Sequence, residues 1–98
     1  MRGVNFKNYY KLFCKLNEGD TDGMERKDYR KKLFSILSDD LEKNFLGGHI
    51  ASIRQIQRND YICKLIVEYY PICSSTISEM YITLMEDVFY INDLCIKY

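Results

Sequence analysis

The C-terminal stretch 74–98, SSTISEMYITLMEDVFYINDLCIKY, decides our expectation of the fold. Thr76 and Glu79 have the spacing of a helix capping box before an apolar run. Apolar residues then recur at intervals of three and four, which places on one helical face Ile77, Met80, Tyr81, Leu84, Val88, Ile91 and Cys95. We therefore predict one long helix over 74–98, with the rest of the chain packed against it.

The upstream sequence shows the same helical period in several shorter segments. Asp22 with Glu25 has capping-box spacing, and Ser38-Asp39-Asp40 has the composition of a further N-cap. Gly47-Gly48 and Pro71 are expected to end helices. The run 61–67, YICKLIV, is also rich in strand-forming residues, so a strand is the alternative there. The predicted helices are 5–16, 22–37, 41–46, 49–57 and 60–70.

Taken together, these patterns predict an all-α fold. The chain has 98 residues, which suits one domain over 1–98, and 47% of them are hydrophobic. We expect a single small helical bundle of four to six helices.

The balance of charge limits the kinds of partner that we expect. Fourteen basic residues face fourteen acidic ones, for a formal net charge of zero. A nucleic-acid-binding domain needs a basic surplus, so nucleic acid is not expected as the main ligand. No run approaches the roughly eighteen apolar residues of a membrane helix, and the N-terminus has no apolar run of signal-peptide type. We expect an intracellular protein in the cytoplasm with no membrane contact.

The residues that could carry catalysis are few. Cys14, Cys63 and Cys95 lie in apolar runs and are expected to be buried, reduced thiols, whereas Cys73 is expected in a loop. No Cys-x-x-Cys pair occurs, and His49 is the single histidine. We therefore expect no enzyme and no cofactor, with a cysteine-dependent enzyme centred on Cys73 as an alternative.

The layout of 9–33 resembles an EF-hand, with two amphipathic helices around an acidic loop at 17–28. Asn17, Asp22 and Asp28 are the candidate metal residues, but Gly19 and Thr21 replace expected oxygen ligands. A second segment, 60–85, resembles another EF-hand whose loop at 70–75 has no carboxylate. The two together resemble a degenerate EF-hand pair of the size of an S100 protein. This resemblance implies calcium-independent binding of a partner helix, with a calcium switch as the alternative.

The N-terminal half also resembles the LYR-type adaptors of mitochondrial assembly. Tyr9-Tyr10-Lys11 would stand for the family's Leu-Tyr-Arg, and Phe34 for its downstream Phe. Two of the three signature residues are substituted. The resemblance implies an assembly adaptor.

Tyrosine is unusually common, with nine residues in 98. Tyrosine is favoured at interfaces because it buries a large area while keeping a polar tip. We take Tyr10, Tyr70 and Tyr90 as interface candidates. The resulting hypothesis is a non-catalytic protein–protein interaction module, a subunit or regulator of a larger assembly, with a homodimer as one form of partner.

Overall fold

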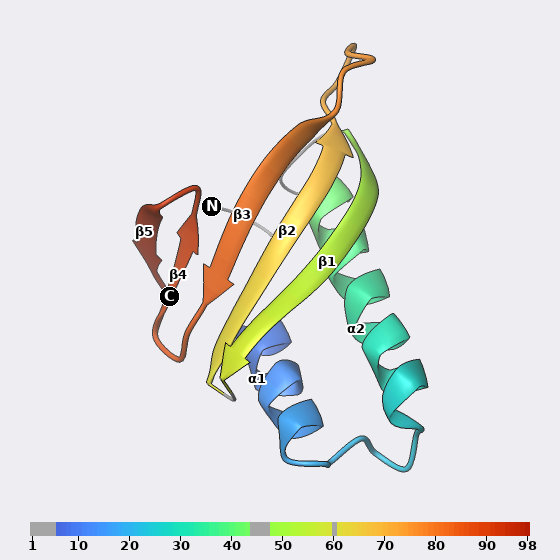
Figure 1. Ribbon diagram of the computed structural model, residues 1–98, viewed down its shortest axis with the longest axis vertical. Coiled ribbons are helices and arrows are strands. Elements are labelled where there is room, and N and C mark those ends of the chain that lie inside the picture. Colours follow the sequence, from blue (N-terminus) through green and yellow to red (C-terminus); the bar gives the residue numbers. More distant parts are fainter. Residues whose placement is uncertain (1–5, 44–47, 60) are drawn as a thin grey trace.

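A computed structural model describes residues 6–43, 48–59 and 61–98 of the chain (Figure 1). Two helices come first and five strands follow them. The strands form one antiparallel sheet in sequence order, β1-β2-β3-β4-β5. The elements are α1 (Phe6–Asn17), α2 (Arg26–Leu41), β1 (His49–Asn59), β2 (Ile62–Tyr70), β3 (Ser78–Leu84), β4 (Val88–Ile91) and β5 (Leu94–Lys97).

The prediction of an all-α bundle of four to six helices is therefore wrong. The stretch 74–98, predicted as one long helix, contains the three strands β3, β4 and β5. In β3 the buried residues are Met80, Ile82 and Leu84, which alternate with more exposed ones as the two faces of a strand require. Asn92 and Asp93 both have positive φ and make the tight turn between β4 and β5.

The middle of the chain is also strand where helices were expected. The segment predicted as a helix over 49–57 is β1, and most of 60–70 is β2; residue 60 lies outside the described residues. Cys63, Leu65 and Val67 are buried in β2, which has the period of two of a half-buried strand. The alternative of a strand at 61–67 is therefore confirmed for Ile62 onward. The strand ends at Tyr70, directly before Pro71.

The two helices at the N-terminal end are confirmed, with different bounds for the second. Helix α1 covers the predicted segment, although its predicted start at residue 5 lies outside the described residues. Helix α2 begins after Glu25 and continues through Ser38, so the capping box at Asp22 and the new N-cap at Ser38 are both wrong. Asp22 has positive φ, a loop conformation that cannot start a helix. Of the expected third helix 41–46, residues 44–47 lie outside the described residues.

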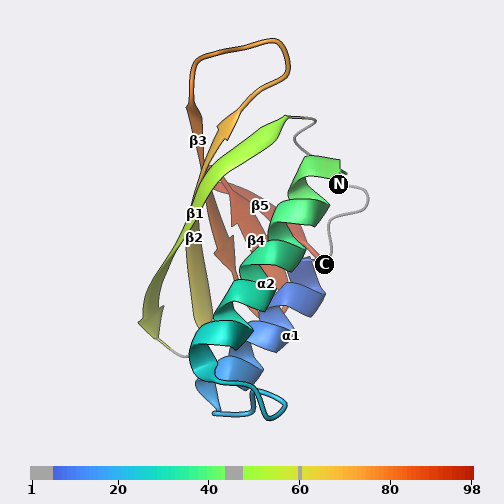
Figure 2. The ribbon, with the colours of Figure 1, turned by 90° about the vertical axis from the view of Figure 1, so that its right-hand side faces the viewer.

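The fold has two layers, because both helices lie on the same side of the sheet (Figure 2). Helix α1 contacts α2 and β3, and α2 contacts β1. The core between the layers includes Phe13, Tyr29 and Leu84, each fully buried. Phe6 at the start of α1 packs on Phe89 of β4, with ring centroids 4.7 Å apart. This arrangement leaves the opposite sheet face without a covering helix among the described residues.

Candidate functional site

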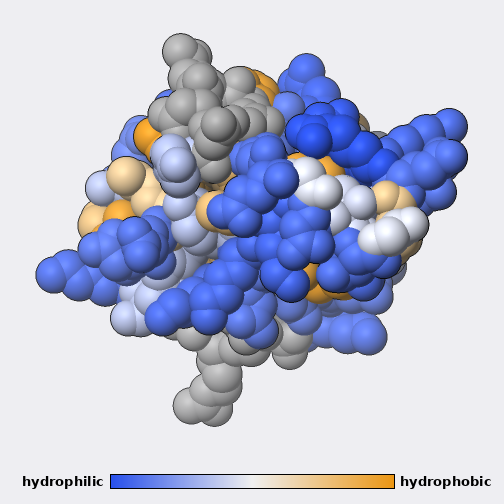
Figure 3. Space-filling model, turned by 90° about the horizontal axis from the view of Figure 1, so that it is seen from below, coloured by the Kyte–Doolittle hydropathy of each residue, from blue (hydrophilic) through white to orange (hydrophobic). Residues whose placement is uncertain are grey.

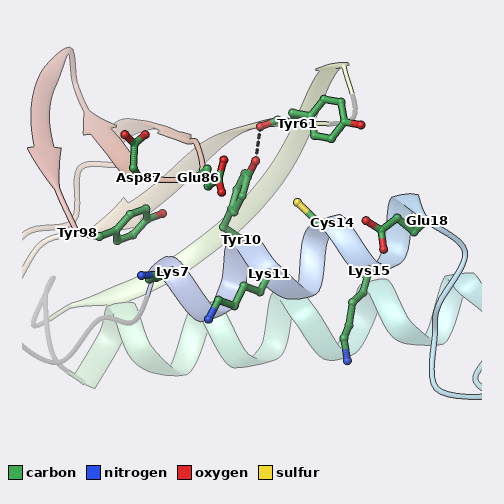
Figure 4. Close-up of a pocket in the computed structure, with 10 residues that line it drawn as sticks. All are labelled: Lys7, Tyr10, Lys11, Cys14, Lys15, Glu18, Tyr61, Glu86, Asp87 and Tyr98. Carbon is green, nitrogen blue, oxygen red and sulfur yellow. Dashed lines mark hydrogen bonds between the residues drawn. The ribbon is translucent and has the colours of Figure 1, made fainter.

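A hollow of about 950 Å³ lies beside α1. Helix α1 supplies one wall, and the other walls come from the β1–β2 turn, the β3–β4 turn and the C-terminal residue (Figure 4). Three basic and three acidic side chains line it. The lining residues are Lys7, Tyr10, Lys11, Cys14, Lys15, Glu18, Tyr61, Glu86, Asp87 and Tyr98.

The nucleophilic groups in this α1 cavity are held in their protonated forms. Burial raises the pKa of Tyr10, whose hydroxyl donates a 2.7 Å hydrogen bond to the carbonyl oxygen of Tyr61 (Figure 4). Burial also raises the pKa of the Cys14 thiol, against a hydrogen bond with Tyr10 that lowers it. Burial raises the pKa of Tyr98 to about 12. A thiol becomes a nucleophile as its thiolate, so the raised pKa makes Cys14 a weak nucleophile at neutral pH.

A second, smaller groove of about 560 Å³ brings His49 and Cys73 to the same place. Nδ1 of His49 lies 3.4 Å from a carboxylate oxygen of Glu42. Cys73 lies in the exposed β2–β3 loop and has positive φ. The predicted loop position of Cys73 is thus confirmed. Both side chains are largely open to water, so the groove lacks the enclosed, low-dielectric setting that helps a catalytic thiol and base.

Predictions for the other cysteines hold in part. Cys63 is buried, as expected, and Cys14 is half-buried on α1. Cys95 is exposed, so the prediction of a buried thiol is wrong there. Its position on β5, opposite Tyr90, points it to the sheet face away from the helices. All four thiols are free.

The candidate metal residues lie at the junction of the two helices. Asn17 ends α1, Asp22 lies in the connecting loop, and Asp28 lies in the first turn of α2. Within the described residues, no group of three or more His, Cys, Asp or Glu side chains is placed to hold a metal ion. The second resemblance required helices at 60–85, and these residues form β2, the following loop and β3.

The sheet face turned away from both helices, which we call the outer face, carries exposed apolar side chains among polar ones such as Lys64, Glu68 and Thr83. One row across β1, β2 and β3 consists of Arg54, Ile66 and Tyr81. The next row includes Ile56 on β1 and Tyr90 on β4. Ile56 is 41% exposed and Tyr81 is 52% exposed. Sheets with one solvated face normally place polar residues at these positions.

The three tyrosines predicted as interface residues do not lie together. Tyr10 is buried on α1 below the α1 cavity. Tyr70 lies at the end of β2 and is exposed, while Tyr90 is half-buried on the outer face. Tyr81, which sequence reasoning assigned to a helical core face, is the more exposed aromatic of the outer face. The signal in the sequence that could have found it is the alternation of the apolar Met80, Ile82 and Leu84 with the residues between them, which is typical of a strand.

The surface at the end of the molecule where α1 meets α2 differs from the outer face in its hydropathy. Viewed from that end, the visible surface is mostly hydrophilic, with small hydrophobic areas (Figure 3).

No protein-family model matches the chain, and no match was found among curated proteins or solved structures. Neither of the two described helices is long and apolar enough to cross a membrane. The function is therefore argued from the geometry alone.

Proposed function

We propose that this protein is a non-catalytic protein-interaction module, a subunit or regulator of a larger assembly. The observation that carries the proposal is the outer face of the sheet. Ile56, Ile66, Tyr81 and Tyr90 occupy positions where a solvated sheet face favours polar side chains, and no helix of the described chain covers them. A partner protein would bury this apolar area, and its removal from water would contribute favourable hydrophobic free energy to binding.

The chemistry of the two hollows supports a binding role. In the α1 cavity the hydroxyls and the thiol are held protonated, and in the second groove His49 and Cys73 are open to water. Neither place offers an activated nucleophile together with an enclosed oxyanion site.

We also propose that the protein works inside the cell, in the cytoplasm. Its four cysteines are free thiols, which fits a reducing compartment. A secreted domain of this size would more often use them in disulfides.

The test is the native mass of the tagged protein in lysate, measured by size-exclusion chromatography with immunodetection. We expect elution far above the 11.7 kDa of the chain. Tyr81→Ser removes exposed aromatic area from the outer face, so it should shift the protein toward the free form. Leu94→Ser is the control, because Leu94 is 66% exposed on β5, lies opposite the buried Ile91 and so off the outer face, and lines neither hollow. Elution of the wild-type protein as a monomer would refute the proposal.

A further inference from the structure

Strand β1 is an edge of the sheet and is its longest strand, with eleven residues. In an antiparallel pair every second residue turns its N–H and C=O away from the neighbouring strand. The register with β2 shifts near Ala51 and again near residue 58, but it is unbroken from Ser52 to Gln57. The outward edge of β1 therefore presents a regular row of backbone donors and acceptors over 52–57. Such a row is a template for another extended chain.

A groove of about 500 Å³ runs beside this edge, between β1 and α2. Phe34 of α2 and Ile53 of β1 are half-buried and give the groove an apolar floor. Arg30 of α2 and Arg54 of β1 are exposed at its rim. A strand added to β1 would thus find backbone partners, an apolar contact and two positive charges in one place.

The positive charge extends along α2. Lys27, Arg30, Lys31 and Phe34 are spaced three and four residues apart, so they share one side of the helix. Asp28 is the acidic residue within this length of α2, and it lies three residues before Lys31, so it offsets one of the three positive charges. Among the residues that the structure describes, the side chains of Lys27, Arg30, Lys31 and Arg54 have no ion-pair or hydrogen-bond partner. This side of the molecule is locally basic although the whole chain has no net charge.

We propose that the β1 edge and the α2 groove together bind an acidic, extended segment of a partner protein as a sixth strand of the sheet. The segment's backbone pairs with 52–57. Its side chains on the helix side contact Phe34 and Ile53 and reach Arg30, and its side chains on the outer-face side lie near Arg54, so carboxylates are favoured on both of its faces. This recognition mode takes affinity from main-chain hydrogen bonds and specificity from the side chains. The inference rests on the proposed function, since it names the kind of partner that the module binds.

A second copy of this chain fits the same edge poorly. Antiparallel pairing of β1 with another β1 would bring two Arg54 side chains and two basic sides of α2 toward each other. Like charges so placed repel, and charged residues on edge strands are a known protection against self-pairing. The charge that disfavours self-association is the charge that favours an acidic partner.

The experiment is a fluorescence-anisotropy titration of the full chain against a labelled heptapeptide of sequence Glu-Glu-Val-Val-Glu-Glu-Val, which has Glu and Val on both of its faces when it is extended. We expect saturable binding that weakens as salt is raised. Arg30→Glu and Arg54→Glu should each weaken it about tenfold or more. Lys32→Glu is the matched control, because it reverses a charge on the opposite, exposed side of α2 and should leave binding unchanged. All three side chains are exposed, so folding is expected to survive each change.

Hydrogen exchange of the same complex tests the strand itself. Peptide binding should slow exchange of the outward N–H groups in 52–57. Binding without this protection, or equal weakening by Lys32→Glu, would overturn the inference in favour of unspecific attraction to charge. Tighter binding of a labelled single-stranded oligonucleotide than of the peptide would overturn it in favour of nucleic acid. Dimerisation of the chain alone with protection at 52–57 would overturn it in favour of a second copy.

The native-mass measurement separates this inference from the proposed function. A large particle that persists in Arg30→Glu, together with no peptide binding, overturns the strand-addition site and leaves the interaction module standing. A monomeric wild-type protein in lysate overturns the module itself, whatever the peptide does.

Discussion

Two adjacent tyrosines on α1 are expected to respond in opposite directions to the same change, loss of the hydroxyl. Tyr9 is 2% exposed, and its buried hydroxyl has no hydrogen-bond partner among the described residues. Tyr10 is also buried, but its hydroxyl donates to the carbonyl oxygen of Tyr61 at 2.7 Å. An unpaired buried hydroxyl costs folding free energy, whereas a paired one contributes to it.

We expect Tyr9→Phe to raise the free energy of unfolding by about 1 kcal/mol, because it removes a desolvated group that forms no bond. Tyr10→Phe should lower it by about 1 kcal/mol, because it removes the hydrogen bond from the Tyr10 hydroxyl to the carbonyl oxygen of Tyr61. For a domain of this size each change corresponds to roughly 4–8 °C in Tm.

Urea unfolding followed by circular dichroism measures both variants, and an unchanged m-value shows that the comparison is one of native stability. Each variant serves as the control for the other, since both remove one oxygen from a buried ring on the same helix. A loss of stability in Tyr9→Phe equal to that in Tyr10→Phe would refute the reasoning, because it would mean that the Tyr9 hydroxyl is paired.

Three further predictions concern the thiols and a close backbone contact. Burial raises the pKa of Cys63 from 9.0 to about 12. The thiol therefore ionises first in the unfolded chain, so between about pH 9 and pH 12 it should lower the free energy of unfolding by about 1.4 kcal/mol per pH unit, in addition to the fall caused by the tyrosines whose pKa values burial also raises; an equally steep fall in Cys63→Ala would contradict this. Gly48→Ala should lower the free energy of unfolding by about 1–3 kcal/mol, because its Cβ would collide with the carbonyl oxygen of Tyr70, and unchanged urea unfolding would count against that contact. Native Cys73 should react with a thiol reagent as fast as a cysteine in a flexible peptide, whereas Cys63 should react far more slowly; a rate for Cys73 about tenfold above the peptide's would instead support the cysteine-enzyme alternative.

The helices could be predicted from the sequence because their apolar residues fit only one period. In α1 the buried residues Phe6, Tyr9, Phe13 and Leu16 are spaced three and four apart, and no alternation competes with that pattern. The pattern of apolar residues in α1 therefore fits a helix and does not fit a strand.

The strands were misread because apolar residues occupy both of their faces. In β2 the buried Cys63, Leu65 and Val67 are interleaved with Ile62 and Ile66 on the outer face. A run that is apolar at nearly every position contains spacings of two, three and four at once, so the helical period is matched by chance. The apolar residues of the outer face, on which the proposed function rests, are thus the reason why the strands could not be recognised in the sequence.

The residues of the β4–β5 turn contained a signal for two strands that the prediction of one long helix did not use. Asn92 and Asp93 lie between two short apolar runs, and residues of this kind favour the positive φ of a two-residue hairpin. In the predicted helix they were treated as a polar interruption of one face. The candidate grooves could not be predicted, because each joins residues from elements whose pairing depends on the sheet.

The contact between Phe6 and Phe89 has a consequence for how the protein folds while the ribosome synthesises it. The first described helix and the fourth strand meet ring to ring, so the core closes across nearly the whole length of the chain. The hairpins need only short loops and can form early, whereas this closure must wait for β4. Until β4 leaves the exit tunnel, Phe6 lacks its ring contact with Phe89. The nascent chain is then an unfinished core that chaperones can bind, and the core closes only after β4 has been synthesised.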